Sequence, residues 1–245
     1  MTMQVERAVL LKDLHVKGRP LVLFNIWDAG SAQAIQSTGA KAIATGSWSV
    51  AAAHGYEDGE KLPFDLVLAN LTRIISNVNL PVTIDLEGCY GQSPTEAQAA
   101  IVKIIEAGAV GINFEDQIIG GDELYSIENQ CARIKAIRAV AERMSIPLFI
   151  NARTDIFLKV DPAKHNDSYL KEAIHRATAY AESGANGYFV PGLRSEKYIE
   201  KLCDISPVPI NIMMMSGMPS PKELESWVLH ALVMALGRIV RRLML

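Results

Sequence analysis

Charged side chains end several of the most apolar runs in this sequence. The run "PVTIDLEG" carries Asp85 and Glu87 near its end, "VGINFED" ends in Glu115 and Asp116, and "FINARTD" carries Arg153. Carboxylates gathered in one place repel one another unless a cation lies among them. Oxygen ligands without a nearby histidine or cysteine favour Mg²⁺, or Mn²⁺, over zinc. The planar guanidinium of the arginine would then bind a substrate carboxylate through two parallel hydrogen bonds.

Short apolar runs alternate with helical segments along the chain and would bring these side chains together. We predict strands at 21–27, 41–45, 81–86, 110–115, 147–152, 187–190 and 209–213, and helices between them, for example at 93–107, 126–143 and 169–183. This order is typical of parallel strands with right-handed helical crossovers. It predicts a (β/α)₈ TIM barrel with one strand unaccounted for. A doubly wound sheet is the alternative, but no Gly-rich dinucleotide loop follows the first strand.

Polar residues follow most of the predicted strands at their carboxyl ends, where a TIM barrel holds its active site. Besides the acids and the arginine above, they are Asn25, Trp27, Asp28, Thr45, Gly46, Ser47, Asp116, Asn151, Asp155 and Asn211. Any one acid alone is better explained as a solvated loop residue or a helix N-cap, and we assign Asp116 and Asp155 to such supporting roles. Acids after strands three and four, together with an arginine after strand five, favour a site over that explanation.

The composition excludes several other classes of protein. The formal net charge of −3 gives no overall reason to expect nucleic-acid or membrane binding. The 3 cysteines are too few and too scattered for a disulfide framework or a zinc motif. No signal peptide or membrane-spanning run is recognisable. We therefore expect a cytoplasmic enzyme in which residues 1–245 form a single barrel domain.

Five motifs, in this order, resemble the isocitrate lyase and phosphoenolpyruvate mutase superfamily. They are "LFNIWDAGSAQAIQSTGAKAIATGS", "TIDLEGCYG", "GINFEDQ", "INARTD" and "PINIM", which together extend over nearly the whole chain before its tail. The resemblance implies a (β/α)₈ barrel that binds Mg²⁺ and a small α-oxocarboxylate. It also implies an enolpyruvate-like species in the transition state, which the metal would stabilise.

The resemblance also implies roles for individual residues. Asp85 resembles the direct metal ligand, and Asp58 of "GYEDGE", Glu87 and Glu115 resemble the carboxylates that hold the metal through water. Substrate-binding positions are Thr45, Gly46, Ser47, Arg153 and Asn211, and the catalytic positions are Arg153 and Glu115.

The chain departs from the family at three places. Position 87 is Glu where the family usually has Asp, and the glutamate usual after strand six is replaced within "FVPG". The lyases carry a Lys-Lys-Cys-Gly-His loop after strand four, whose cysteine is an acid–base group. The corresponding stretch here, "QIIGGDELYSIENQ", has no Cys, Lys or His. Cleavage of isocitrate or methylisocitrate by the usual mechanism is therefore not expected.

Three functional hypotheses remain. The first is an Mg²⁺-dependent enzyme that cleaves a C–C or P–C bond of an α-oxocarboxylate, as a decarboxylase, lyase or hydrolase does. The second is a catalytically impaired family member that binds a small oxo-acid without turnover. The third is an unrelated barrel, such as a Schiff-base aldolase. It is disfavoured because no lysine ends a predicted core strand, Lys159 lying beyond strand five.

The tail at 227–245 does not match the family-like barrel at 1–226. "ESWVLHALVMALGRIVRRLML" has the pattern of an amphipathic helix with a basic end. Back-translation with chosen codons, read one frame away, yields a segment similar to the family's eighth strand. We therefore hypothesise a frameshift near Ser226 that has replaced the eighth strand and the C-terminal helices. The resemblance implies a homo-tetramer or dimer built with those helices, so the altered tail leaves the oligomeric state open.

Overall fold

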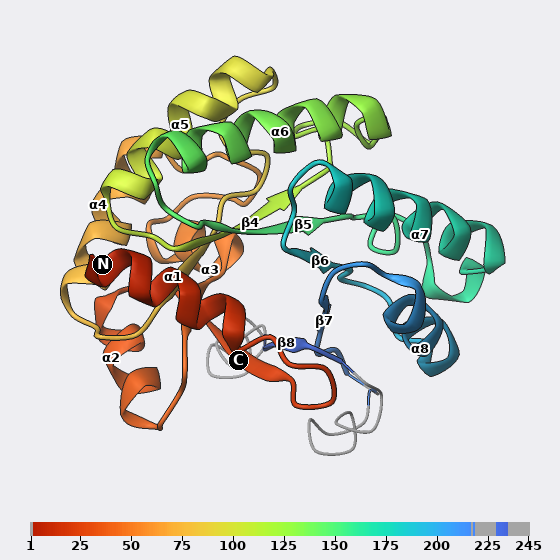
Figure 1. The fold of residues 1–245 in the computed structure, drawn as a ribbon, viewed down its shortest axis with the longest axis horizontal. Coiled ribbons are helices and arrows are strands. Elements are labelled where there is room, and N and C mark those ends of the chain that lie inside the picture. Colours follow the sequence, from red (N-terminus) through yellow and green to blue (C-terminus); the bar gives the residue numbers. More distant parts are fainter. Residues whose placement is uncertain (1, 217, 219–228, 235–245) are drawn as a thin grey trace.

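Eight parallel strands close into a barrel in the computed structural model of the chain, which describes residues 2–216, 218 and 229–234 (Figure 1). The strands are β1 (Leu21–Ile26), β2 (Ile43–Thr45), β3 (Val82–Asp85), β4 (Gly111–Glu115), β5 (Phe149–Arg153), β6 (Gly187–Phe189), β7 (Ile210–Met213) and β8 (Ala231–Met234). The predicted TIM barrel is confirmed, and each of the seven predicted strands is present with small shifts at its ends.

Helices surround this barrel in the described part of the chain. They are α1 (Met3–Asp13), α2 (Ala29–Ser37), α3 (Ser47–Ala53), α4 (Phe64–Ser76), α5 (Pro94–Glu106), α6 (Ile127–Arg143), α7 (Asp167–Glu182) and α8 (Glu196–Ile205), with a 3₁₀ turn at Pro162–Lys164. The predicted helices at 93–107, 126–143 and 169–183 are α5, α6 and α7. Capping boxes begin two helices, with Asp28 as the N-cap of α2 and Ser93 as the N-cap of α5. Asp28 is therefore a helix cap.

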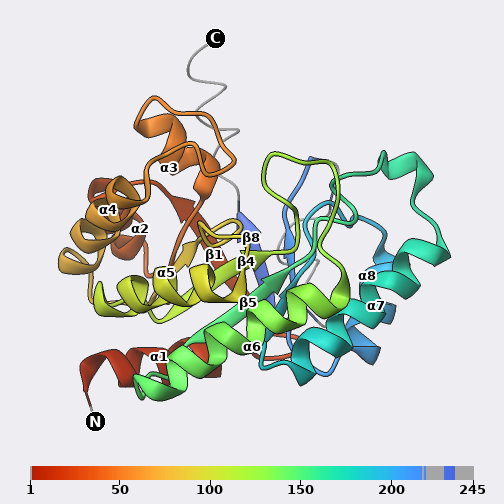
Figure 2. The ribbon, with the colours of Figure 1, turned by 90° about the horizontal axis from the view of Figure 1, so that it is seen from above.

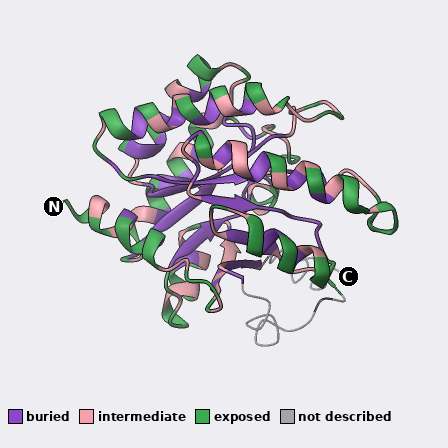
Figure 3. Ribbon diagram, turned by 45° about the vertical axis from the view of Figure 1, so that its right-hand side comes forward, coloured by how far each residue is buried: buried purple, intermediate pink, exposed green. Residues whose placement is uncertain are grey.

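The two ends of the barrel differ in what covers them. Helix α1 lies at the end opposite α3 and the long loops (Figure 2). Its Ala8 and Leu11 belong to one buried cluster with Leu21, Leu23 and Phe149 of the strands. Strands are almost wholly buried, whereas the helices turn exposed faces outward (Figure 3). The end covered by α1 is thus closed by apolar packing, and the polar strand ends lie at the other. No helix among the described residues is long and apolar enough to cross a membrane.

The structure corrects our expectation about the eighth strand. Residues Ala231–Met234 form β8, which pairs in parallel with β1 and with β7. Leu229 and Leu232 are fully buried. The expectation that the tail lacks an eighth strand was therefore wrong, whereas the hypothesis of a frameshift stays a prediction.

The physical reason lies in the apolar pattern of the tail. A continuous apolar run suits a strand buried on both faces as well as a helix, and periodicity alone does not separate the two. Two unpaired strand edges, on β1 and β7, favour a strand at this place in the barrel. The proposed frameshift position near Ser226 and the C-terminal helices fall outside the described residues.

Candidate active site

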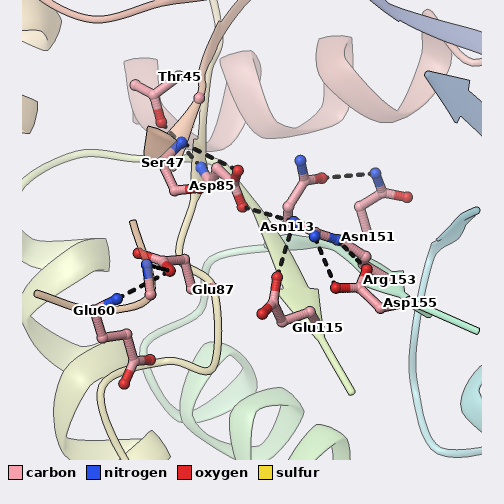
Figure 4. A network of polar contacts seen from close by, with 12 residues as sticks. Thr45, Ser47, Glu60, Asp85, Glu87, Asn113, Glu115, Asn151, Arg153 and Asp155 are labelled. Atoms are coloured by element: carbon pink, nitrogen blue, oxygen red, sulfur yellow. Dashed lines mark hydrogen bonds and ion pairs between the residues drawn. The ribbon is translucent and has the colours of Figure 1, made fainter. Parts of the chain in front are cut away.

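Three adjacent strands bring the main charged side chains together at the end of the barrel opposite α1. Their register places Asp85 of β3 beside Asn113 of β4, and Glu115 of β4 beside Arg153 of β5. Asp85, Glu115 and Arg153 turn toward one another in the close view (Figure 4). The expectation that strand ends would gather acids around one arginine is met for these three residues.

Asp85 has one carboxylate oxygen in use and one free. Its Oδ2 accepts a hydrogen bond from the Ser47 N–H at 3.2 Å, and its own N–H donates to Thr45 Oγ1 at 3.0 Å. Its Oδ1 is buried and has no hydrogen-bond partner within the described part of the chain. The nearest cationic atom is Arg153 Nη1, at 4.0 Å. Because a buried carboxylate oxygen without a partner is costly, this oxygen suits a cation ligand.

Arg153 is held on two sides by carboxylates. Its Nε and Nη2 donate to the two oxygens of Asp155 at 2.6 and 2.9 Å, and its Nη1 lies 2.8 Å from Glu115 Oε2. Burial by itself would lower the pKa of Arg153, but Glu115, Asp155 and Asp85 raise it overall. The guanidinium is therefore a fixed, permanent cation with Nη1 directed toward the acids of the site.

Glu87 lies in the turn that follows β3. Its backbone has φ of 49°, and its Oε2 accepts hydrogen bonds from the N–H groups of Gly59 and Glu60 at 2.8 and 3.0 Å. Burial, and then the nearby carboxylates of Asp58 and Asp85, raise the pKa of Glu87 to about 8. This side chain ties the loop between α3 and α4 to the site.

Glu115 and Asp58 share this acidic environment. Burial raises the pKa of Glu115 well above its ordinary value, although Arg153 opposes the shift. Asp58 lies on an exposed stretch of the loop, but its carboxyl group faces the site closely enough for desolvation, and then Asp85, to raise its pKa. The Ser47 hydroxyl and Arg153 lower the pKa of Asp58 in part. The site therefore holds more carboxyl groups than Arg153 alone can neutralise as carboxylates, so bound protons or a cation must balance the rest.

The four predicted metal ligands do not form a compact direct ligand set. Within the described residues, no group of three or more His, Cys, Asp or Glu side chains has the arrangement of such a set. The unpartnered oxygen of Asp85 still fits one direct bond to a hard cation, with Glu87, Asp58 and Glu115 around it. Mg²⁺ commonly keeps several waters and takes only one or two protein carboxylates, so these residues suit Mg²⁺.

The predicted substrate cradle is already hydrogen-bonded within the protein. The Ser47 N–H is directed at Asp85, and the Gly46 N–H donates to Ile26 O at 3.2 Å. The Thr45 hydroxyl accepts from the backbone of β3. Thr45 and Ser47 line a pocket beside Asp85, so the segment borders the site. A ligand that uses the Ser47 N–H would have to displace the contact to Asp85.

Asparagine side chains lie inside the barrel near these strand ends. Asn211 is fully buried, and neither its Oδ1 nor its Nδ2 has a partner in the described structure. Asn151 Nδ2 donates to Asn113 Oδ1 at 2.7 Å. A side chain at Gly46 would place its Cβ 2.9 Å from Asn25 Nδ2, so any larger residue there would have to displace the Asn25 side chain. Asn211 thus has spare hydrogen-bonding capacity.

Sequence reasoning missed one further residue of this region, Arg133 in the middle of α6. It is buried, its Nη2 donates to the carbonyl oxygens of Gly88 and Gly91, and its guanidinium lies over the rings of Phe114 and Tyr125 at 4.6 and 4.3 Å. It therefore holds the turn that carries Glu87. Nothing in the sequence marked it, since an arginine on an amphipathic helix is ordinarily exposed.

The segment after β4 also differs from a loop bearing acid–base residues. It folds back on itself through a bridge between Gln117 and Leu124, and Lys159 Nζ donates to Gly121 O at 3.1 Å. Cys89 is fully buried, and burial raises the pKa of its thiol to about 12. Cys89 is therefore a small packing residue and not a nucleophile.

Comparisons with known proteins place the chain among enzymes of one family. The family model described as phosphoenolpyruvate phosphomutase matches residues 11–238. An uncharacterized protein of Mycobacterium tuberculosis is 30% identical over 206 residues, which cover 84% of this chain and 74% of that protein. The 2-methylisocitrate lyase of Escherichia coli is 30% identical over 210 residues, which cover 83% of this chain and 67% of the lyase.

A solved structure is also similar to this chain. A Burkholderia cenocepacia protein, provisionally assigned as a phosphonomutase, is similar with a TM-score of 0.95 and 41% identity over 98% of this chain and 96% of that chain. Other relatives are a 2,3-dimethylmalate lyase of Eubacterium barkeri and an oxaloacetate decarboxylase of Rhodopseudomonas palustris. These relatives thus include lyases, a decarboxylase and a provisionally assigned phosphonomutase.

Proposed function

Because the chain belongs to the phosphoenolpyruvate phosphomutase family, we propose that it is an Mg²⁺-dependent enzyme acting on a small α-oxocarboxylate. The reaction would proceed through an enolate, with cleavage of a C–C or P–C bond, as in a lyase, a decarboxylase or a hydrolase. Named relatives that act as lyases and a decarboxylase support this class of chemistry.

One observation carries the proposal: the free oxygen of Asp85 faces the fixed cation of Arg153. The buried Oδ1 of Asp85 and Nη1 of Arg153 are 4.0 Å apart. An α-oxocarboxylate carries its carboxylate next to its oxo group. Its binding site therefore needs a cationic hydrogen-bond donor for the carboxylate beside a metal ion for the oxo group. Arg153 would supply the donor, and Asp85 would supply a ligand for the metal ion.

Each residue then has a defined task. Asp85 would hold Mg²⁺ directly, and Asp58, Glu87 and Glu115 would hold it through its hydration shell. When bound, the ion would act as a Lewis acid on the oxo group and stabilise the negative charge of the enolate. Arg153 would bind the substrate carboxylate, with Glu115 giving up its contact to Nη1. The backbone at Thr45, Gly46 and Ser47 would border the bound acid.

A binding role without turnover is the second candidate, and a specific observation favours it. The stretch after β4 has no Lys, Cys or His, and it is pinned by Lys159. An enzyme of this kind needs a proton donor or acceptor at the substrate carbon.

Among the reactions of the first proposal, decarboxylation requires the least from the protein, because CO₂ leaves without a base to remove a proton.

Calorimetric titration of oxalate into the purified protein, with and without Mg²⁺, tests the proposal. Oxalate imitates the planar enolate of pyruvate. We expect binding that requires Mg²⁺ and weakens about ten- to a hundredfold in Asp85→Asn, since polar contacts to charged groups contribute about 1.5–3 kcal/mol. Asp13→Asn is the matched control, because Asp13 is exposed and lies toward the opposite end of the barrel.

Two results would contradict the proposal. If the folded protein bound no oxalate at any Mg²⁺ concentration, the site would not be an enolate site. If Asp85→Asn bound oxalate as tightly as the unaltered protein, Asp85 would not be the metal ligand. Oxalate binding combined with no release of CO₂ from oxaloacetate, and no cleavage of other oxo-acids, would support the binding role.

A further inference from the structure

We infer that four buried residues behind the site, Asp155, Asp116, Arg176 and Tyr180, form a relay whose task is to position Arg153. We name this set the Arg153 relay, and its members are positioning residues that act through Arg153. The inference rests on the proposed function, because it assigns Arg153 the task of binding the substrate carboxylate. It extends that function to helix α7, whose residues do not line the pocket at Asp85.

Arg153 needs a device of this kind because it sits among competing acids. Its Nη1 already lies 2.8 Å from Glu115 and 4.0 Å from Asp85. A long guanidinium side chain with no other anchor would settle between these carboxylates and obstruct the metal ligand. Asp155 prevents this by accepting hydrogen bonds from Nε and Nη2 together, which fixes the plane of the guanidinium and leaves Nη1 directed toward Glu115 and Asp85 (Figure 4).

Asp116 holds the segment that carries both partners. Its Oδ1 accepts a hydrogen bond from the Asp155 N–H at 3.1 Å, and its own N–H donates to Arg153 O at 3.0 Å. Both acids are almost wholly buried, Asp116 at 0% and Asp155 at 1% exposure. Asp116 therefore clamps the backbone on each side of Thr154 and fixes the position from which the Asp155 carboxylate reaches Arg153.

Helix α7 supplies the counter-charge for Asp116. The other oxygen of Asp116, Oδ2, accepts hydrogen bonds from Arg176 Nη1 at 3.0 Å and from Tyr180 Oη at 2.9 Å. Arg176 and Tyr180 lie one helical turn apart and contact each other at 2.8 Å. Arg176 Nη1 also donates to Tyr125 O, at the end of the segment after β4.

The network is poorly explained by stability alone. Buried ion pairs lose much of their attraction to desolvation, and apolar residues of similar volume often stabilise a core equally well. A positioning role accounts for the continuous path from Arg153 to α7, in which every link is a hydrogen bond to a charged group. A substitution on α7 should therefore alter the binding of the ligand to Arg153, although the substituted residue does not touch the ligand.

A double-mutant cycle on oxalate binding in the presence of Mg²⁺ tests the relay. Tyr180→Phe removes one hydroxyl and keeps the ring, and we expect about three- to tenfold weaker binding. Asp155→Asn should weaken binding about thirtyfold or more, since it breaks the fork to Arg153. In the double variant the effect of Tyr180→Phe should fall below about twofold, because Tyr180 acts through Asp155.

A second readout needs no ligand and no activity. The Nε–H of Arg153, followed by NMR in the ligand-free protein, should exchange slowly with solvent and faster in Tyr180→Phe and Asp155→Asn. One control variant on α7 should leave this exchange unchanged: Tyr169→Phe, because the Tyr169 hydroxyl makes no hydrogen bond in the described structure.

The two readouts separate the possible failures. If the unaltered protein binds no oxalate, the proposed function fails. The exchange rate of the Arg153 Nε–H then still tests the relay, because that measurement needs no ligand. If Tyr180→Phe lowers the melting temperature but leaves that exchange unchanged, the network is only structural and the inference is wrong. Strictly additive effects in the double-mutant cycle would overturn it as well.

Discussion

Single side chains in this site have pKa values that make its behaviour depend on pH. Glu87 is the clearest case, because burial and the carboxylates of Asp58 and Asp85 raise its pKa from 4.5 to about 8. Between about pH 4.5 and 8, the folded protein therefore keeps a proton on Glu87 that the unfolded chain has already released. Its contribution to stability is complete below the unfolded pKa and is lost as pH rises through 8.

We predict that Glu87→Gln removes this pH dependence. Glutamine keeps an oxygen that can accept from Gly59 and Glu60 but carries no charge. In the presence of a chelator, the unaltered protein should lose a few kcal/mol of stability between pH 6 and pH 9 relative to the variant, since one pKa unit corresponds to about 1.4 kcal/mol. Thermal melts of both proteins across this range measure the difference. Parallel curves for the two proteins would show that Glu87 is ionised throughout.

At the scale of elements, the turn between β3 and α5 carries unusual backbone strain. Glu87, Cys89 and Tyr90 all have positive φ, at 49°, 69° and 51°. Such conformations persist only where the surroundings determine them, and they are common at functional sites. Here the carbonyl oxygens of Gly88 and Gly91 are held from α6 by Arg133. The turn that presents Glu87 is thus set by a helix that follows the next strand in the sequence.

We therefore expect Arg133→Met to lower stability by about 2–4 kcal/mol, because it leaves buried carbonyl groups unpaired. It should also weaken Mg²⁺-dependent oxalate binding, since the turn would relax. Arg143→Met is the matched control: Arg143 is exposed in the last turn of the same helix and should change stability by less than about 1 kcal/mol. Chemical denaturation measures both variants. Equal stability of the two would mean that the turn is held by other contacts.

At the scale of the whole molecule, closure of the barrel depends on the four residues of β8. They lie between β1 and β7, and without them both strands would present unpaired edges. Closure also matters for the site, because Asn211 of β7 is buried only in a closed barrel. The tail that departs from the pattern of the family therefore still contributes to the fold.

Substitution of Leu232 tests this closure directly. Leu232 is fully buried in β8, so Leu232→Ala should lower stability by about 2–4 kcal/mol. Leu10→Ala is the matched control, because Leu10 is 46% exposed on α1 and should lose much less. If residues 231–234 instead lay in a surface helix, the two substitutions would have similar effects. Denaturant unfolding of both variants distinguishes these outcomes.

The positions of the strands and of the main charged residues could be predicted from the sequence. Strand and helix signals are local, since they depend on apolar periodicity and on capping residues within a few positions. The order of acids and arginine at the strand ends then needed only the rule that parallel strands converge at one face. Asp85, Glu115 and Arg153 were found in this way. The motifs themselves were specific enough to indicate the family.

The tertiary structure alone decided how those residues are paired and how the barrel closes. Asp155, assigned from the sequence to a supporting role, binds Arg153 directly, and the buried Arg133 gave no local signal. Residues 231–234 suited a helix or a strand until two strand edges were available to pair with them. The physical reason is the same in each case. These choices depend on groups that are distant in the chain and meet only in the folded protein, whereas the strands depend on neighbours in the sequence.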